Sequence, residues 1–337
     1  PESRIQKICT LNNDKNLTVN INGSKVFSFE MREILRAYSE TSIAIQKIRD
    51  NSVTAEEELN SILDETDPGL FIESKKFNTP NIIKKNTARV GILREQGVNG
   101  HKEMAAAFFA AGFEPIDIHM TDILSGEENL ESMIGLAVCG GFSYGDVMGA
   151  GRGWASTIQE NIIANEVFRE FFKKEESFTL GVCNGCQMLS HLKHIIPGTT
   201  SWSSFEKNKS GQFEARLSMV EVIESPSIFL TGLEGMKAPI VVAHSEGKIS
   251  SDIADKGIEC LRYIDNYGKT TSSYPANPNG SQAGITGLTS TDGRVTIMMP
   301  HPERVFLSKQ FSWLPYDWRD HESPWLQMFK NARKFAY

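Results

Sequence analysis

The stretch Gly181-Val182-Cys183-Asn184-Gly185-Cys186-Gln187 decides the fold. Residues 178–180 before it are typical of the end of a buried strand, and residues 188–192 after it of the first turns of a helix. A glycine-flanked turn between strand and helix, with a thiol at its apex, is typical of a nucleophile elbow. Such a turn raises one side chain above the carboxyl edge of a parallel sheet, and the N–H groups of the following helix can hold developing negative charge. Cys183 is therefore the candidate nucleophile.

The composition indicates a globular protein with a sizeable core. The chain has 337 residues, 40% of them hydrophobic, which suggests one large domain and a smaller part. The net charge of -7 argues against a nucleic-acid partner. No apolar run approaches the roughly 18 to 20 residues that span a bilayer, and the N-terminus has no signal-peptide core. We expect a soluble, cytoplasmic protein without a membrane partner, and a chain beginning at Pro1 is expected to be a fragment or a processed product.

Residues 1–86 do not look like a complete domain. Residues 17–22 alternate as a strand does, Asn22-Gly23 offers a hairpin turn, and residues 26–49 carry apolar side chains at helical spacing. Acidic, turn-rich segments follow, and residues 80–87 resemble a polar linker. A hairpin and one helix make a poor core, so this incomplete α+β segment is expected to dock on something else.

From residue 88 the pattern alternates between strands and helices. Buried strands are predicted at 89–93, 115–120 and 135–139, and helices at 101–111 and 154–172. Together with the strand before Cys183 they predict an α/β fold: a mainly parallel open sheet with helices on both faces. Ligands bind at the carboxyl ends of such strands, where Cys183 and the glycine-rich residues 139–146 fall.

The rest of the chain continues in the same pattern. Shorter strands are expected at 213–222, 239–243 and 261–264, and residues 294–299 have the apolar character of a central strand. A final amphipathic helix is expected from Ser323 to about Lys334.

A thiol nucleophile needs a base, and the base needs an orienting partner. His301 follows the strand at 294–299 on the same side as Cys183, and Glu303 lies two residues further on. In an extended segment these two side chains share a face, and Pro302 favours an extended backbone, so imidazole and carboxylate can meet. The alternative is that His301 ends a strand and Glu303 pairs with Arg304.

An acyl-transfer site also needs donors for a tetrahedral oxyanion. The amide of Asn184 and an amide from Gly140 or Gly141 are the natural candidates. Cys183 and Cys186 also form a C-x-x-C pair, which is compatible with a redox dithiol or half a zinc site. No second Cys or His pair completes four ligands, so no metal is expected.

These motifs resemble the triad-type (class I) glutamine amidotransferases. The resemblance is carried by the elbow, the earlier glycine pair and His301-Pro302-Glu303. Longer stretches, at residues 93–99, 139–147, 274–281 and 299–306, are similar to glutaminase domains joined to the C-terminal end of a single-chain synthase of purine biosynthesis. Residues 1–86 then resemble the end of the synthase domain plus a linker, and residues 87–337 the glutaminase domain.

The resemblance implies a role for each matching position. Cys183 would attack the side-chain amide of glutamine, His301 would move the proton, and Glu303 would orient His301. The substrate-binding residues would be Gln187, His244 and Glu246. Ammonia would pass to the N-terminal synthase portion, the expected partner, which would use ATP and Mg; no cofactor is expected in residues 87–337.

Two alternatives stay open at this stage. The chain could be a docking or regulatory module that is inactive without the synthase portion. It could also carry out thiol-disulfide exchange, which would need both Cys183 and Cys186.

Overall fold

The computed structural model describes residues 9–77, 88–249 and 257–336. The chain divides into two compact units, Pro1–Asp67 and Pro68–Tyr337. The linker predicted at residues 80–87 lies outside the described residues at all positions. The predicted domain boundary at residue 86 stays a prediction.

The first unit contains a β-hairpin and two helices. Strand β1 (Asn16–Ile21) pairs antiparallel with β2 (Ser24–Glu30) across a turn in which both residues, Asn22 and Gly23, have positive φ, as a tight hairpin turn requires. Helices α1 (Met31–Arg49) and α2 (Ser52–Ile62) follow. The prediction of a helix from residue 26 is wrong at its start, because residues 26–30 belong to strand β2. Helix α2 was not predicted.

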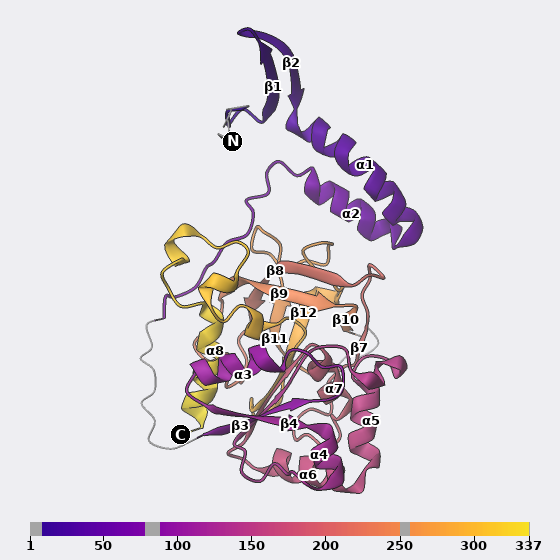
Figure 1. Ribbon diagram of the computed structural model, residues 1–337, viewed down its shortest axis with the longest axis vertical. Coiled ribbons are helices and arrows are strands. Elements are labelled where there is room, and N and C mark those ends of the chain that lie inside the picture. The colour runs from indigo at the N-terminus through magenta and orange to yellow at the C-terminus, as the bar shows by residue number, and fades with distance from the viewer. Residues whose placement is uncertain (1–8, 78–87, 250–256, 337) are drawn as a thin grey trace, which may run out of the picture. The chain divides into compact units, whose positions relative to one another are not determined.

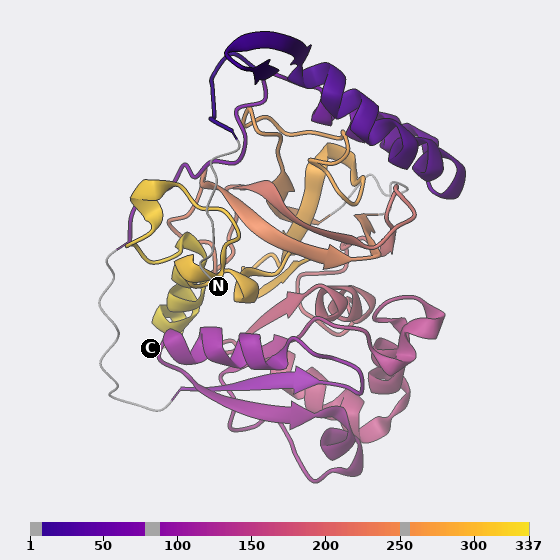
Figure 2. The same ribbon diagram turned by 45° about the horizontal axis from the view of Figure 1, so that its top comes forward.

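The second unit is built on a nine-stranded sheet in the described part of the chain, in the order β4-β3-β5-β6-β13-β12-β11-β8-β9. One half is parallel and the other antiparallel, and Figures 1 and 2 show β3 and β4 of the parallel half in purple and β9 and β11 of the antiparallel half in orange. The parallel strands are β3 (Arg89–Arg94), β4 (Glu114–His119), β5 (Gly135–Val138), β6 (Phe178–Val182) and β13 (Val295–Met298). The antiparallel strands are β8 (Glu214–Val222), β9 (Lys237–His244), β11 (Ile258–Tyr263) and β12 (Ile285–Thr289), each paired to its neighbour across the sheet.

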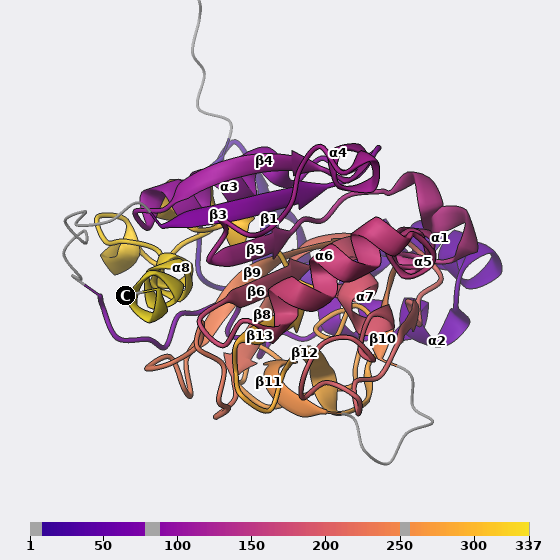
Figure 3. The ribbon, with the colours of Figure 1, turned by 90° about the horizontal axis from the view of Figure 1, so that it is seen from below.

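Helices cover both faces of this sheet. Helices α3 (His101–Ala110) and α8 (Pro324–Phe335) pack together on one face. A connected layer of four helices covers the other, with α6 crossing the parallel strands in Figure 3: α4 (Met120–Ser125), α5 (Arg152–Glu160), α6 (Ile162–Lys173) and α7 (Asn184–His191). The prediction of an α/β fold with an open sheet and helices on both faces is confirmed.

Shorter elements complete the unit. Strands β7 (Phe205–Lys207) and β10 (Glu246–Ile249) pair as a small separate sheet. Single turns of 3-10 helix occur at η1 (Tyr144–Met148), η2 (Gln282–Gly284), η3 (Pro302–Arg304), η4 (Ser308–Gln310) and η5 (Tyr316–Trp318).

The long helix predicted at residues 154–172 is wrong, because the structure has two helices there. Asn161 between α5 and α6 has an extended backbone, with φ -88° and ψ 120°. Its side-chain oxygen accepts a hydrogen bond from the amide of Ala164 at 2.9 Å and so caps the start of α6. The cap lets the chain change direction at Asn161. The apolar spacing continues through both helices, so the sequence pattern predicts a single helix.

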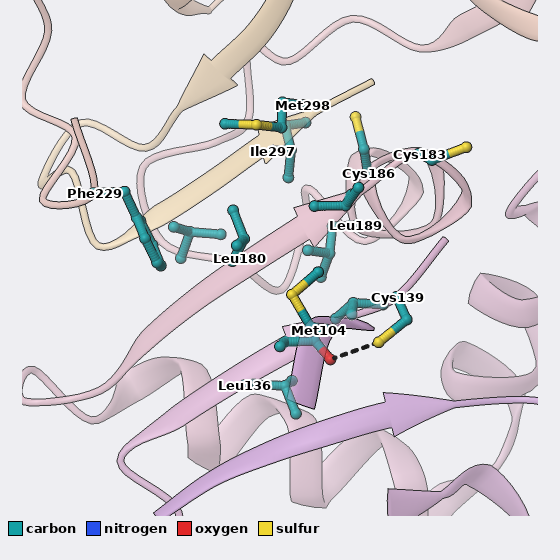
Figure 4. Packing of buried hydrophobic residues seen from close by; sticks show 14 of the residues in the cluster. Met104, Leu136, Cys139, Leu180, Cys183, Cys186, Leu189, Phe229, Ile297 and Met298 are labelled. Atoms are coloured by element: carbon teal, nitrogen blue, oxygen red, sulfur yellow. Dashed lines mark hydrogen bonds between the residues drawn. The ribbon is translucent and has the colours of Figure 1, made fainter. Parts of the chain in front are cut away.

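The core surrounds the central strand β6, all of whose residues are buried. Leu180 of β6 and Leu189 of α7 lie in the same buried cluster as Ile297 of β13 (Figure 4). Such apolar runs fit strands that are covered on both faces. The strand therefore holds the start of α7 rigidly at its carboxyl end.

No helix among the described residues is long and apolar enough to cross a bilayer.

Candidate active site

Cys183 lies at the turn between β6 and α7, in a strained backbone conformation. Its φ is 54° and its ψ is -112°, which is uncommon for a residue other than glycine. Its amide donates to the carbonyl of Met298 at 2.9 Å, and its carbonyl accepts from the amide of Gln187 at 3.1 Å. These bonds fix the turn between β13 and the first turn of α7. The prediction of a strand, a tight turn and a helix around the thiol agrees with this geometry.

Gly185 lets α7 approach the sheet. A Cβ at this position would lie 2.1 Å from the carbonyl oxygen of Val138, at the end of β5. Any larger residue would push the helix away from the strand. The glycine after the elbow therefore sets the height of Cys183 above the sheet edge.

His301 and Glu303 are buried together just after β13. Nδ1 of His301 lies 2.6 Å from Oε1 of Glu303, and the carboxylate therefore accepts a hydrogen bond from Nδ1–H. Nε of Arg304 is 4.0 Å from the same oxygen. Glu303 thus contacts the imidazole more closely than it contacts the guanidinium.

The expected extended backbone between His301 and Glu303 is wrong. Residues Pro302–Arg304 form the 3-10 turn η3, and the amide of Arg304 donates to the carbonyl of His301 at 3.3 Å. Proline begins such turns readily, because its φ is fixed near the helical value and it needs no amide partner there. The turn, rather than a shared strand face, brings the carboxylate to the ring.

Cys183 and His301 meet against Gly140. An ideal Cβ on Gly140 would lie 2.7 Å from Cε1 of His301 and 3.0 Å from Cβ of Cys183. The glycine leaves just enough room for the thiol residue and the imidazole to stand side by side. Nδ1 of His301 is bonded to Glu303, so Nε2 is the ring nitrogen available to the Cys183 thiol or to a ligand.

The electrostatics of His301 favour its charged form. Burial alone would lower its pKa, but the charges of Glu303 and of a Cys183 thiolate outweigh burial and raise the pKa to about 9. The imidazole is therefore protonated near neutral pH when it faces the thiolate. This arrangement can supply a proton to a leaving group.

A cavity of about 310 Å³ opens above Cys183. Of the predicted site residues, seven line it: Cys183, His301, Gly141, Asn184, Gln187, His244 and Glu246. Gly140 and Glu303 lie behind this wall, in contact with His301. The structure therefore gathers all the predicted site residues around one cavity.

Asn184 joins the glycine loop to the start of α7. Its Nδ2 donates to the carbonyl of Gly141 at 2.8 Å and to Oδ2 of Asp146 at 2.6 Å. The first amides of α7 and the loop of Gly140 and Gly141 therefore lie at the same edge of the cavity. Their use as oxyanion donors stays a prediction.

Asp146 has a position that the sequence did not assign. Besides Asn184, it accepts hydrogen bonds from the amides of Ser143 at 2.8 Å and Gly151 at 3.1 Å. Burial raises the pKa of its carboxyl, and these hydrogen bonds act in the opposite direction. The spacing of Ser143 and Asp146 is that of a capping box, and this signal could have identified the pair.

The predicted substrate contacts line the same cavity. Nε2 of Gln187 donates to the carbonyl of Glu246 at 2.7 Å, and a carboxylate oxygen of Glu246 accepts from the amide of Ala150 at 3.2 Å. His244 is buried, and its Nδ1 lies 3.1 Å from Oδ1 of Asn208. Phe142 and Phe213, which were not predicted, pair at 5.9 Å between ring centroids and also line the cavity.

Cys186 takes no part in the cavity. Its side chain is buried among core residues, and in Figure 4 it points in a different direction from Cys183. Burial raises the pKa of its thiol well above the ordinary value. Both cysteines are free thiols, and among the described residues no group of three metal-ligating side chains gathers.

The fold and the site define an α/β protein with a cysteine nucleophile elbow, beside a buried histidine and glutamate. Residues 87–336 match the family of CobB/CobQ-like glutamine amidotransferase domains, and the chain belongs to this family.

Two solved structures align with the chain, and the first shares its fold. The structure of PurLQS from Thermotoga maritima aligns with a TM-score of 0.57 at 22% identity, over 75% of this chain and 100% of that chain. A glutamine amidotransferase from Thermotoga maritima aligns with a TM-score of 0.41 at 17% identity, over 65% of this chain and 77% of that chain. At these identities the first likeness supports the architecture, while the family match supports the class of enzyme.

Proposed function

We propose that the domain of residues 87–337 hydrolyses glutamine to glutamate and ammonia through a γ-glutamyl thioester on Cys183. The observation that carries the proposal is the strained elbow of Cys183, which opens on a cavity beside His301, with His301 in turn held by Glu303 at 2.6 Å. A nucleophile, a base and an orienting acid in this order are what acyl transfer requires.

In the first half-reaction the Cys183 thiolate attacks the side-chain amide carbon of glutamine, and a C–S bond forms. Negative charge develops on the amide oxygen, and the amides of Asn184 and Gly140 or Gly141 would stabilise it. Protonated His301 gives a proton to the amide nitrogen as the C–N bond breaks. Ammonia leaves, and the γ-glutamyl thioester remains.

In the second half-reaction His301 acts as a base. Water attacks the thioester carbon while the neutral imidazole takes one of its protons. The C–S bond breaks, and Cys183 leaves as a thiolate beside the protonated His301, which is the starting state. The new carboxyl group releases its remaining proton to solvent, and glutamate leaves. Glu303 keeps the ring in the tautomer that both steps need.

We further propose that the ammonia serves the synthase portion of a single-chain phosphoribosylformylglycinamidine synthase. That portion would use ATP and Mg to convert formylglycinamide ribonucleotide to formylglycinamidine ribonucleotide. The motif resemblances across residues 93–99, 139–147, 274–281 and 299–306 support this assignment, and the family match agrees with its glutaminase half. Residues 1–86 would be the end of the synthase domain and a linker.

Labelling with 6-diazo-5-oxonorleucine, an alkylating analogue of glutamine, tests the nucleophile. The proposal expects one label, on Cys183, by peptide mass spectrometry. Cys183→Ala should abolish labelling and glutamate release, while Cys186→Ala should keep both, because Cys186 is buried away from the cavity. A label found on Cys186 alone would contradict the proposal, and loss of activity in Cys186→Ala would favour dithiol chemistry.

Glutamate release is measured with and without added synthase portion. This distinguishes a self-sufficient glutaminase from a docking or regulatory module that is inactive alone. Turnover by the isolated chain supports a self-sufficient glutaminase. Turnover that appears only when the synthase portion is added supports the docking and regulatory alternative.

A further inference from the structure

The two ring nitrogens of His244 have different roles, and Asn208 decides which is which. Nδ2 of Asn208 gives its two hydrogens to the carbonyls of Gln212 at 3.0 Å and His244 at 2.7 Å. The oxygen Oδ1 of Asn208 therefore faces the imidazole, 3.1 Å from Nδ1. Because an amide oxygen can only accept, Nδ1 of His244 carries the hydrogen.

The ring of His244 is neutral, so its other nitrogen is a bare acceptor. Burial, and then the neighbouring His301, lower the pKa of His244 to about 3. A neutral imidazole with its hydrogen on Nδ1 presents a lone pair at Nε2. Nε2 is buried and accepts no hydrogen bond from the residues that the structure describes. A buried acceptor without a donor is costly, which points to a donor on a bound molecule.

The backbone at His244 lies near the reactive end of the cavity. His244 lines the same cavity as Cys183. The carbonyl of Ala243, the preceding residue, is 3.6 Å from Sγ of Cys183. The ring is also held closely, because a Cβ on Gly247 would lie 2.6 Å from its Cε1 and 3.0 Å from its Nε2, so only a glycine fits there. His244 is therefore fixed near the thiol and not at the far end of the cavity.

We propose that Nε2 of His244 accepts a hydrogen bond from the side-chain amide nitrogen of glutamine, and so selects a carboxamide over a carboxylate or an ester. The inference rests on the proposed function. When the amide carbon of glutamine contacts Sγ of Cys183, the side-chain NH₂ group is the hydrogen-bond donor of glutamine nearest to the thiol. Glutamate brings an oxygen without hydrogen to the same place, where lone pairs repel, so the contact also favours release of the product.

The test compares two substrates that form the same thioester. The leaving group of glutamine is ammonia. The leaving group of glutamate γ-methyl ester is methanol, and this substrate has no N–H group in its side chain. His244→Leu should lower kcat/KM for glutamine by about tenfold to a hundredfold, and leave kcat/KM for the ester within about twofold. His244→Gln should restore part of the glutamine activity, because its Oε1 can reach the place of Nε2.

A matched control is His191→Leu. His191 also has a lowered pKa, of about 4, mainly through burial, but it lines a different cavity. This variant should leave both substrates unaffected. Equal labelling of Cys183 by 6-diazo-5-oxonorleucine in all variants shows that the site is folded.

The outcomes distinguish this inference from the proposed function. An equal fall of kcat/KM for both substrates in His244→Leu overturns the inference, because it shows that His244 has a structural role. The wild-type chain can be labelled on Cys183 and still not hydrolyse glutamine alone. In that case each substrate is tested for its ability to protect Cys183 from 6-diazo-5-oxonorleucine. Only the protection by glutamine should weaken in His244→Leu. A wild-type chain that is neither labelled nor active, even with the synthase portion, refutes the proposed function itself.

Discussion

Replacing Gly140 by alanine tests whether the spacing of Cys183 and His301 governs the reaction. The added Cβ would lie 2.7 Å from Cε1 of His301 and 3.0 Å from Cβ of Cys183. Carbon atoms in ordinary contact are about 3.5 to 4.0 Å apart. The imidazole must therefore retreat by about 1 Å, and Cys183 by roughly half as much.

A displacement of this size predicts a large kinetic effect and a moderate effect on stability. Misplacing a reacting group by about 1 Å can cost about a hundredfold in rate, which corresponds to about 2.7 kcal/mol. Overpacking of this kind lowers the free energy of unfolding by about 1 to 3 kcal/mol. The amide hydrogen of residue 140 remains in the variant, so the lost rate reports on spacing and not on a lost oxyanion donor.

The assay measures glutamate release, labelling of Cys183 and urea unfolding for Gly140→Ala and a matched variant, Gly91→Ala. A Cβ on Gly91, in β3, would lie 2.8 Å from Cδ1 of Ile118, away from the cavity. This variant should lose stability by a similar amount and keep its kcat/KM. Wild-type kcat/KM in Gly140→Ala, or an equal kinetic loss in Gly91→Ala, would refute the reasoning.

Three further predictions concern single residues. Glu303→Gln should lower the pKa of His301 from about 9, because the charge that raises it is removed, and should reduce turnover by about a hundredfold or more; an NMR titration of His301 and a rate assay check both. Asn161→Ala should lower the free energy of urea unfolding by about 1 kcal/mol through loss of the helix cap, with turnover unchanged. The folded-state pKa of His244, about 3, lies below the ordinary 6.5. Its neutral form therefore supports stability above pH 6.5, and this support is lost as the pH falls towards 3, by about 1.4 kcal/mol per pH unit. His244→Leu should flatten the measured slope by about that amount.

The parallel half of the fold was readable from the sequence because its signals are local. Strands β3, β5 and β6 are short apolar runs, and α3 and α7 follow two of them directly. Each element could be placed from its own residues, and the rule that parallel strands share a carboxyl edge then placed Cys183 with the glycine loop.

Other elements depend on partners that are distant in the sequence. Strand β12 was not predicted, although all its residues are buried, because its place between β11 and β13 gives it its partners. The short strands β7 and β10 exist only as a pair. The break at Asn161 was missed because the apolar spacing continues through it, and only the side-chain cap shows where one helix ends.

The same distinction separates the site residues that were predicted from those that were not. His301 and Glu303 are two residues apart, so their contact could be inferred, although the turn that makes it was not. Asp146 contacts Asn184, which is 38 residues away in the sequence, and Asn208 contacts His244, which is 36 residues away. These contacts could not be inferred from local spacing.

Asn184 and Asn208 have the same effect on the cavity wall. Each amide gives both of its Nδ2 hydrogens to fixed oxygens, which determines the direction of its own oxygen. Asn208 thereby leaves Nε2 of His244 as a bare acceptor, and Asn184 keeps its own Oδ1 buried without a partner in the described chain. His244 and Asn184 both line the cavity, and each leaves one buried acceptor without a donor among the described residues. A sequence cannot show these acceptors, because the direction of an amide is set by partners that only the folded chain brings together.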